Sequence, residues 1–408
     1  MAGLLISPFA ASTSRADDWP QWRGPTRDSR AAERAWPSSL GEDNLKLAWR
    51  VPLGPSYSGP VVVGNRVFTT ETRNKTTEVV SAYDLRTGEH LWSTDWPGAM
   101  TVPFFAASNG SWIRATPACD DQMIFVAGIR DVLVALDQAT GDVVWKVDFT
   151  KEFGTPLPSF GFASSPLVHD DALFVQAGGG FVKIDKRSGA ILWRTAVDGG
   201  GMSGGAFSSP LITTHQGRQL ALVQTRLALK GIDPESGEEM WSQPIKAFRG
   251  MNILTPTVHG GHVFTSAHTG QSQLWQLPVG ESDESNKSGL ELLWTSRSQA
   301  YMSSPVVVED HLYLHLRNQR IQCIDLKTGE ETWRTTPFGK YQSMAVVGTN
   351  ILALDQRGEL ILFRADPNKF DKIDSRKLGD EETWAHIAIS GNQIFIRELN
   401  GLAAYDWN

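Results

Sequence analysis

The chain has 408 residues and a formal net charge of −7, with 20% charged residues, 38 Gly and 15 Trp. An acidic chain without a basic stripe interleaved with aromatic residues argues against a nucleic-acid partner. No stretch is long and apolar enough to span a membrane. The composition is typical of a large globular protein with many turns and a substantial aromatic core.

The first residues, MAGLLISPFAASTSRA, hold a short apolar core and a small-residue site that ends at Ala16. This pattern predicts a cleaved signal peptide and therefore a periplasmic or secreted protein, although no Lys or Arg precedes the apolar core. We divide the chain into a signal peptide (1–16), an N-terminal segment (17–43) and one repeat domain (44–408).

The repeat domain contains Asp, Gly and Trp at a fixed spacing, with Gly four residues and Trp eight residues after the Asp. Apolar runs on both sides predict two strands around a tight turn, in which Gly takes the left-handed position and Asp binds free amides. We expect each Trp to pack between neighbouring repeats and not on a ligand. The five copies are Asp84, Gly88, Trp92; Asp137, Gly141, Trp145; Asp185, Gly189, Trp193; Asp233, Gly237, Trp241; and Asp325, Gly329, Trp333.

A further pair of strands starts at each of six Ser-Ser-Pro-like motifs, as in SSPLVHDDALFVQAG from Ser164; the other five start at Ser58, Thr116, Ser208, Thr255 and Ser303. Two weaker copies start at Ser343 and Ala385, which gives eight units of four strands. The last unit lacks its outer strand, and NLKLAWRVPLG (44–54), with Trp49, can supply it by pairing with the C-terminal LNGLAAYDW. Four-stranded repeats of about 40 to 50 residues predict an all-β fold, an eight-bladed β-propeller closed by an N-terminal strand.

The starts of the innermost strands should line the central channel. They read YSGP, RATP, FASSP, FSSP, ILTP, MSSP, QSMA and WAHI, and none of them contains Asp or Glu. We therefore expect no catalytic residue and no metal site there. Large or polar residues stand where other repeats place Ser-Ser or Ser-Gly, and they are our candidates for a small-molecule site at the channel mouth: Arg114, Asn252, Tyr301, Trp384 and His386.

The two faces of the predicted ring differ in charge. Turns between second and third strands carry arginines, whereas the DxxTG turns of the other face carry Glu and Asp. The arginine-rich face would dock an anionic partner, an acidic protein segment or an anionic polysaccharide, or else its arginines are solvated hairpin ends. Phe104 and Phe105, in a long connection on the same face, are either anchors for a partner or a plug for the channel. The candidate face comprises Arg73, Arg130, Arg226, Arg317, Arg320, Arg357, Phe104 and Phe105.

The two cysteines, Cys119 and Cys323, fall in blades on opposite sides of the predicted ring. We expect them to be unpaired and buried.

The repeat ALDxxTGxxxW preceded by SSPxV resembles the pyrroloquinoline-quinone-type (PQQ-type) propeller repeat, a WD40/YVTN-like architecture. The resemblance covers residues 18–407 and is shared by quinoprotein alcohol dehydrogenases and the BamB-type outer-membrane assembly propellers. For a dehydrogenase it implies PQQ, calcium bound by carboxylates and an aspartate base, which the channel motifs do not offer. For a BamB-type lipoprotein it implies a Cys after the signal, and no Cys precedes Cys119.

We therefore expect an exported monomeric propeller that binds a protein or ligand without catalysis and without a cofactor, in the manner that the BamB resemblance implies. The alternatives are a PQQ-dependent dehydrogenase with calcium and a carbohydrate or peptide sensor. Because the repeat builds blades, the motif is specific for the fold and weak for the function.

Overall fold

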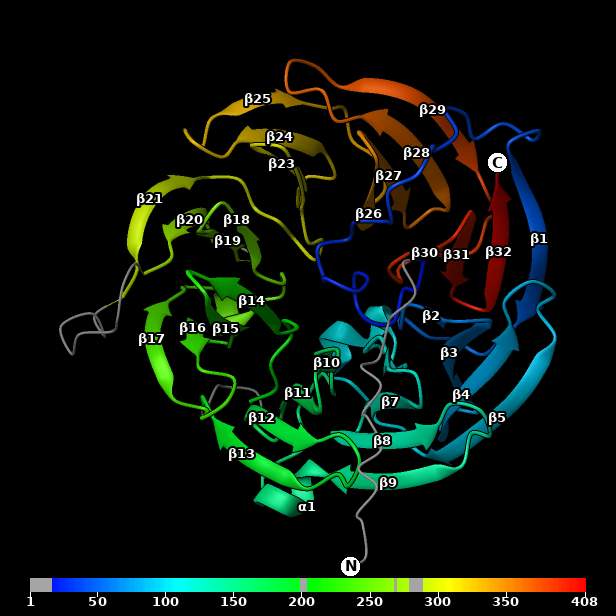
Figure 1. Ribbon diagram of the computed structural model, residues 1–408, viewed down its shortest axis with the longest axis vertical. Coiled ribbons are helices and arrows are strands. Elements are labelled where there is room, and N and C mark those ends of the chain that lie inside the picture. The colour runs from blue at the N-terminus through cyan, green and yellow to red at the C-terminus, as the bar shows by residue number, and fades with distance from the viewer. Residues whose placement is uncertain (1–16, 199–203, 268–269, 279–288) are drawn as a thin grey trace, which may run out of the picture.

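Short apolar strands alternate with tight turns along the described chain, and within each sheet the consecutive strands pair antiparallel. The computed structural model describes residues 17–198, 204–267, 270–278 and 289–408. The signal peptide predicted for residues 1–16 lies outside them. Eight four-stranded sheets surround a central axis (Figure 1), which confirms the predicted eight-bladed propeller.

In blades 1 to 4 the strands run in chain order from the inner to the outer edge of each sheet. They comprise β2 (Val61–Val63), β3 (Arg66–Arg73), β4 (Thr77–Asp84), β5 (His90–Pro97); β6 (Ala118–Cys119), β7 (Met123–Gly128), β8 (Val132–Asp137), β9 (Val143–Asp148); β10 (Leu167–His169), β11 (Ala172–Ala177), β12 (Gly180–Asp185), β13 (Ile191–Thr195); β14 (Leu211–His215), β15 (Arg218–Gln224), β16 (Ala228–Ile232), β17 (Glu239–Pro244).

Blades 5 to 8 follow the same order, except that the outer strand of blade 8 comes from the N-terminal end of the chain. They comprise β18 (Thr257–His259), β19 (His262–Ser266), β20 (Ser272–Gln276), β21 (Glu291–Ser296); β22 (Val306–Val308), β23 (His311–His315), β24 (Ile321–Asp325), β25 (Glu331–Arg334); β26 (Gln342–Val347), β27 (Asn350–Asp355), β28 (Glu359–Arg364), β29 (Asp371–Lys377); β30 (Ala388–Ser390), β31 (Gln393–Glu398), β32 (Gly401–Trp407), β1 (Leu45–Pro52). Three helical turns lie in connections between blades: η1 (Phe104–Asn109), α1 (Phe149–Phe153) and η2 (Phe248–Gly250).

The ring is closed by its two ends, as predicted. Strand β1 pairs antiparallel with β32, and Trp49 lies opposite Ala404. The N-terminal strand is thus the outer strand of blade 8. Among the described residues, no helix has both the length and the hydropathy that crossing a membrane requires.

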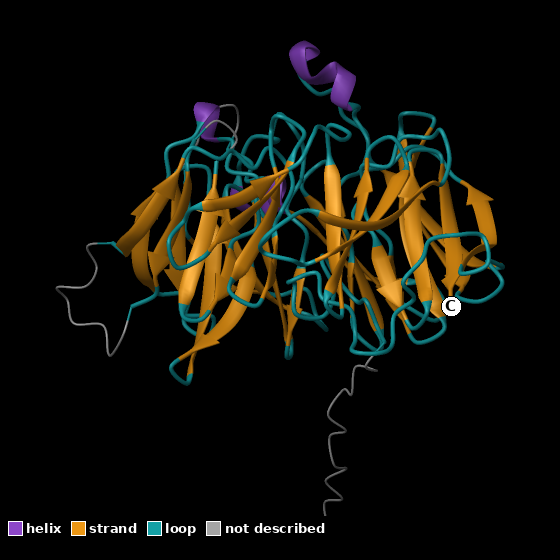
Figure 2. Ribbon diagram, turned by 90° about the horizontal axis from the view of Figure 1, so that it is seen from above, coloured by secondary structure: helices purple, strands orange, loops and turns teal. Residues whose placement is uncertain are grey.

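The strands run between two faces (Figure 2). We call the face with the connections into the inner strands the loop face, and the opposite one the DxxTG face. The helical turns belong to connections of the loop face. Cys119 and Cys323 are buried and free, on β6 and β24, as predicted.

The DxxTG turns have the predicted chemistry. In the first of them, Oδ1 of Asp84 accepts hydrogen bonds from the amides of Arg86 and Thr87, 3.1 and 2.9 Å away. These bonds hold the pKa of Asp84 below its usual value. The five turn glycines have φ between 71 and 78°, the left-handed region that favours glycine.

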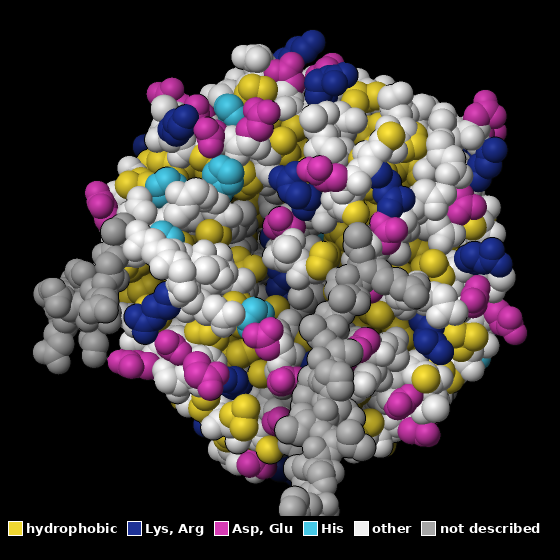
Figure 3. All heavy atoms as spheres, viewed as in Figure 1, with side chains coloured by type: hydrophobic (Ala, Val, Ile, Leu, Met, Phe, Trp, Pro, Cys, Tyr) yellow, Lys and Arg dark blue, Asp and Glu magenta, His cyan; other side chains and the backbone are white. Residues whose placement is uncertain are grey.

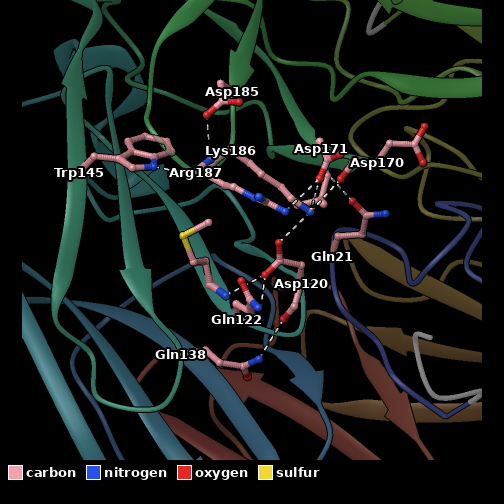
Figure 4. Close-up of polar contacts among 12 residues, drawn as sticks. Gln21, Asp120, Gln122, Gln138, Trp145, Asp170, Asp171, Asp185, Lys186 and Arg187 are labelled. Atoms are coloured by element: carbon pink, nitrogen blue, oxygen red, sulfur yellow. Dashed lines mark hydrogen bonds and ion pairs between the residues drawn. The ribbon is translucent and has the colours of Figure 1, made fainter. Parts of the chain in front are cut away.

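The spacing of Asp, Gly and Trp is explained by contacts between neighbouring blades. Five Trp residues cover the turn of the following blade, and a Cβ on that turn's glycine would lie under 3.0 Å from the indole of Trp49, Trp92, Trp145, Trp193 or Trp294. The indole of Trp241 instead lies against Gly231 of its own blade. Figure 4 shows Trp145 of blade 2 at Lys186 of blade 3. Indole Nε1 donates to a carbonyl of the next blade in the pairs Trp49–Leu85, Trp92–Gln138, Trp145–Lys186, Trp193–Glu235, Trp294–Leu326 and Trp333–Asp366.

Buried carboxylates connect the same blades near the loop face. Glu78 accepts hydrogen bonds from Nε1 of Trp96 at 2.9 Å and from the amide of Ile129 in blade 2 at 2.7 Å. Asp131 likewise accepts from the amide of Gly178 in blade 3 at 2.9 Å. Burial raises the pKa of Glu78 to about 7 and that of Asp131 to about 6.

The raised pKa of Glu78 predicts a pH-dependent stability. Between about pH 4.5 and 7 the folded state holds a proton that the unfolded chain has already lost, so the free energy of unfolding falls as pH rises, by up to about 3 kcal/mol. We expect Glu78→Gln to flatten this decline, leaving the smaller contribution of Asp131. Urea unfolding at pH 5 to 8 measures it, with the exposed Glu89→Gln as the control. If Glu78→Gln keeps the full decline of the unfolding free energy with pH, a group other than Glu78 causes that decline.

Candidate functional site

The N-terminal segment closes the channel at the DxxTG face. Trp19 forms a bridge with Val62 of blade 1, and the carbonyl of Pro20 accepts from the amide of Cys119 in blade 2. Farther on, the amide of Ala31 donates to Val346 in blade 7. The segment therefore runs across the middle of the ring (Figure 1, blue) and forms the floor of the channel.

Two arginines of this segment are fully buried in the channel. Arg27 donates to the carbonyl of Pro210 in the connection to blade 4 at 2.6 Å, and to Ser165 and Pro166 at the start of blade 3. Arg23 donates to Ser29 and to the carbonyl of Pro305 at the start of blade 6. Burial lowers the pKa of Arg23 to about 10 and of Arg27 to about 9, so both stay charged at neutral pH. The floor is thus positively charged.

Above this floor lies a cavity of about 210 Å³ that opens toward the loop face. Its lining comes from seven of the eight inner-strand starts, as predicted, and from Trp22 of the N-terminal segment. Nε1 of Trp22 donates to Oγ1 of Thr255 at 3.0 Å. The lining residues are Trp22, Tyr57, Arg114, Phe160, Ala163, Ser165, Phe207, Ser209, Met251, Ile253, Thr255, Met302, Ser304, Trp384 and His386.

Three of the five candidate residues line this cavity: Arg114, Trp384 and His386. Asn252 does not, because its amide is buried and donates to the carbonyls of Thr225, Arg226 and Ile245. Tyr301 does not either. It stacks on Tyr341, with ring centroids 5.4 Å apart, and Tyr341 in turn stacks on Trp384.

His386 presents an unsatisfied acceptor. It is 8% exposed, and its Nδ1 lies 3.2 Å from the carbonyl of Ile387. A carbonyl accepts only, so Nδ1 carries the proton and Nε2 is left as an acceptor. Nε2 has no hydrogen-bond partner among the described residues. Burial, helped by the charge of Arg23, lowers the pKa of His386 to about 3, which keeps the ring neutral.

Arg114 places a partly buried cation in the cavity wall. Its guanidinium donates to the carbonyls of Gly110 at 3.1 Å and Trp112 at 3.4 Å, and it forms no ion pair with any carboxylate in the described part of the chain. Burial lowers its pKa to about 10, so it remains charged. The cavity therefore combines a positive charge with aromatic walls.

An aromatic cluster stands on the loop face. Phe104 is 89% exposed and Phe105 50% exposed, with their ring centroids 5.6 Å apart. Phe104 therefore does not plug the channel. Arg249 lies over the rings of Phe105 and Phe248, 5.5 and 5.0 Å from their centroids, and it has a strained φ of 53°. We call Phe104, Phe105, Phe248 and Arg249 the aromatic rim.

The six predicted face arginines differ in exposure. Arg226 is 3% exposed, because its guanidinium donates to the carbonyls of Gly205 and Arg249, so its inclusion in the exposed face was wrong. Two others pair with buried carboxylates of their own blades: Arg73 with Glu71 and Arg357 with Asp355.

Of the remaining three arginines, Arg130 and Arg317 are exposed cations. Arg130 donates to the carbonyl of Ala99, and Arg317 is exposed. Arg320 is half-buried and donates to the carbonyl of Thr335. Figure 3 shows basic and acidic side chains intermingled on the opposite, DxxTG face.

Lys186 illustrates how charges are neutralised on the DxxTG face. Its ammonium group lies 3.0 Å from the Asp120 carboxylate of blade 2, donates to the carbonyl of Asp170 and lies 3.9 Å from Asp171 (Figure 4). The opposite charges of this face therefore pair locally between and within blades.

The cavity does not fit PQQ with calcium as a quinoprotein dehydrogenase would hold them. Calcium prefers several oxygen ligands, usually with carboxylates, and no Asp or Glu lines the cavity. Glu382 is near enough to help raise the pKa of Tyr57 to about 12, after burial, but it is not in the wall. No three His, Cys, Asp or Glu side chains of the described residues come together as a metal site requires. The donor set is that of an anion or polar-ligand site.

Sequence reasoning missed the N-terminal residues of the site. Trp22, Arg23 and Arg27 belong to a segment without strand periodicity, which the sequence analysis gave only as an N-terminal segment (17–43). The arginines inside an otherwise short, turn-rich segment were the available signal, because a charged side chain there needs acceptors from another part of the fold.

These features define the class of protein: an eight-bladed propeller with PQQ-like repeats, a closed channel floor and a cavity on the loop face. The family model described as "Outer membrane protein assembly factor BamB" (PQQ_2) matches residues 76–335. The chain belongs to this family.

Individual relatives agree with this assignment. Outer membrane protein assembly factor BamB of Yersinia pestis is 22% identical over 357 residues, which cover 83% of this chain and 79% of that protein. The structure of BamB from Moraxella catarrhalis covers 89% of this chain and 98% of its own, with a TM-score of 0.65 and 15% identity. Quinohemoprotein alcohol dehydrogenase from Comamonas testosteroni covers 97% of this chain and 81% of its own, with a TM-score of 0.68 and 13% identity. The structural matches establish the fold, which is shared by assembly factors and enzymes.

Proposed function

We propose that this BamB-like propeller is an exported, non-catalytic scaffold that docks a protein partner on its loop face. The exposed aromatic rim carries the proposal. Large aromatic side chains gathered at a surface and bordered by cations are typical anchors of protein interfaces. The names of the relatives suggest outer-membrane protein assembly as the process, and they support a periplasmic location.

The rim also indicates the chemistry of the partner. Phe104 and Phe105 offer apolar surface, whereas Arg249, Arg130 and Arg317 offer positive charge on the same face. A segment with apolar side chains next to carboxylates complements both. The absence of carboxylates from the cavity wall supports a role in binding over PQQ-dependent oxidation.

The proposal is tested by photocrosslinking in cells. Benzoylphenylalanine at position 104 is expected to give a discrete crosslinked adduct in the periplasmic fraction, which mass spectrometry identifies. The matched control carries it at position 192, where Leu192 is 53% exposed on the outer strand β13. Equal adducts from both positions, or recovery of the protein only from the cytoplasm, would contradict docking at the rim or export.

A charge reversal tests the chemistry of the partner. Arg249→Glu in the protein crosslinked at position 104 should reduce the yield of the adduct about tenfold, because it places like charges opposite each other. Arg86→Glu, in an exposed turn of the DxxTG face, should leave the yield unchanged. An unchanged yield with Arg249→Glu would contradict the proposal that the partner is acidic.

A further inference from the structure

The cavity offers hydrogen-bond donors that no group in the described part of the chain accepts. Ser165 Oγ accepts from the amide of Thr116 at 3.0 Å, Ser209 Oγ from that of Ser165 at 2.9 Å, and Ser304 Oγ from that of Thr255 at 3.2 Å. Each hydroxyl thus accepts a bond from the backbone, and its own proton has no acceptor among the described residues. The three serines come from blades 3, 4 and 6, so their free donors surround the cavity.

The opposite requirement comes from His386, whose Nε2 needs a donor. A ligand must therefore supply acceptors to the serines and a donor to the histidine, and hydroxyl groups supply both. A buried polar atom without a partner costs about 1 to 3 kcal/mol, which a bound hydroxyl would recover. A purely apolar or purely anionic ligand would leave one of the two sets unsatisfied.

The positive charges around the cavity favour a ligand that carries an anionic group as well as hydroxyls. Arg114 stands in the wall and forms no ion pair with a carboxylate of the described residues, and Arg23 and Arg27 are buried in the floor that the N-terminal segment forms. Inside the cavity these three cations produce a positive potential that salt screens less than it screens charges on the open surface. A single carboxylate placed at Arg114 would neutralise part of it.

The walls and the size limit the ligand to one ring. Trp384 stacks on Tyr341 and meets the ring of Tyr57 edge to face, with centroids 4.4 Å apart, so its orientation is fixed. Aromatic walls of this kind suit the apolar face of a pyranose. The cavity, about 210 Å³, is smaller than the roughly 300 to 1,000 Å³ of sites for drug-sized molecules.

We propose that the cavity binds one sugar-acid ring, a pyranose with a carboxylate, at a site that adjoins the protein-docking rim, since Phe105 of the rim contacts Phe160 of the cavity lining. The carboxylate pairs with Arg114, the ring hydroxyls bond to the serines and to Nε2 of His386, and the sugar stacks on Trp384. Because the floor is closed by Trp22, the ring enters from the loop face. A terminal uronate of an acidic polysaccharide satisfies the same requirements.

Isothermal titration of residues 17–408 with D-galacturonate, D-galactose and benzoate tests the proposal. Galacturonate is expected to bind at least tenfold more tightly than galactose, which lacks the charge, and than benzoate, which lacks the hydroxyls. Equal binding of galactose or of benzoate would overturn it, and so would no heat from galacturonate at millimolar concentration. Tight, calcium-dependent binding of PQQ would overturn it in favour of a cofactor site.

Two variants and one control separate binding from folding. Arg114→Gln should weaken galacturonate binding about ten- to a hundredfold and leave galactose binding unchanged, because a charge-assisted hydrogen bond is lost. His386→Phe keeps a ring against Trp22 but removes the acceptor, and it should weaken both sugars severalfold. Phe104→Ser, in the aromatic rim, should change neither. If Arg114→Gln weakens both sugars equally with an unchanged melting temperature, the assignment of the carboxylate to Arg114 is wrong.

Discussion

Arg27→Met is expected to lower the free energy of unfolding by about 3 kcal/mol. Arg27 is 2% exposed and donates to carbonyls at the starts of blades 3 and 4. Methionine fills most of the volume but leaves these carbonyls without a donor, at about 1 to 3 kcal/mol each. Part of that cost is recovered, because the variant no longer buries a charge. Urea unfolding with an unchanged denaturant slope measures the difference.

Arg30→Met is the matched control, in the same segment three residues away. Arg30 is exposed and donates to the carbonyl of Val307 at 2.8 Å, and the loss of such a bond in water should cost less than about 1 kcal/mol. If the two variants lose equal stability, the bonds of Arg27 merely offset the cost of burying its charge. The N-terminal segment would then cover the channel without holding the blades together.

The ring of blades could be predicted from the sequence because each blade is specified by residues that lie close together in the chain. The spacing of Asp84, Gly88 and Trp92 fixes a turn and a contact with the next blade, and the same spacing recurs along the chain. The closing strand was also predictable, since blade 8 lacked an outer strand and residues 44–54 lacked a partner. The path of the N-terminal segment was not, because Arg23 and Arg27 find their acceptors 138 to 282 residues away.

The candidate site was predictable only in part. Arg114, Trp384 and His386 were found because they replace small residues at the starts of inner strands, and they line the cavity. The same rule selected Asn252 and Tyr301, which do not line the cavity because each is held by protein groups that the rule could not give. Backbone carbonyls bind the amide of Asn252, and Tyr341 holds the ring of Tyr301. Whether these residues bind a ligand stays a prediction.

The face arginines illustrate the same limit. Arg226 occupies the predicted turn, but the connection that contains Phe248 and Arg249 folds against it and accepts its hydrogen bond. The sequence predicts that an arginine lies on a turn, but whether that arginine is exposed to solvent depends on how the neighbouring loop packs. The exposed aromatic rim therefore had to be found from the structure, although Phe104 and Phe105 were among the candidates.

Gly189→Ala should lower the free energy of unfolding by about 3 kcal/mol. It tests whether the glycine is needed both for its backbone conformation and for the close contact with Trp145. Its φ of 75° alone costs an alanine about 1 kcal/mol. Its new Cβ would also lie 2.7 Å from Cδ2 of Trp145, and relieving such overpacking costs about 1 to 3 kcal/mol more. Gly217→Ala is the matched control, because Gly217 has a φ of 77° and nothing within 4 Å of its Cβ position.

The contribution of the indole contact can be isolated with a double-mutant cycle. If the Trp145 ring is the obstacle, Trp145→Leu alone should destabilise the protein, but Gly189→Ala should then cost no more than the Gly217→Ala control. Urea unfolding of the four proteins gives the coupling energy between the two residues. A coupling near zero would mean that the ring shifts freely and that glycine is needed only for its backbone conformation. A coupling of about 2 kcal/mol would mean that the Asp-Gly-Trp spacing is maintained by the contact between blades, since the turn alone would tolerate asparagine.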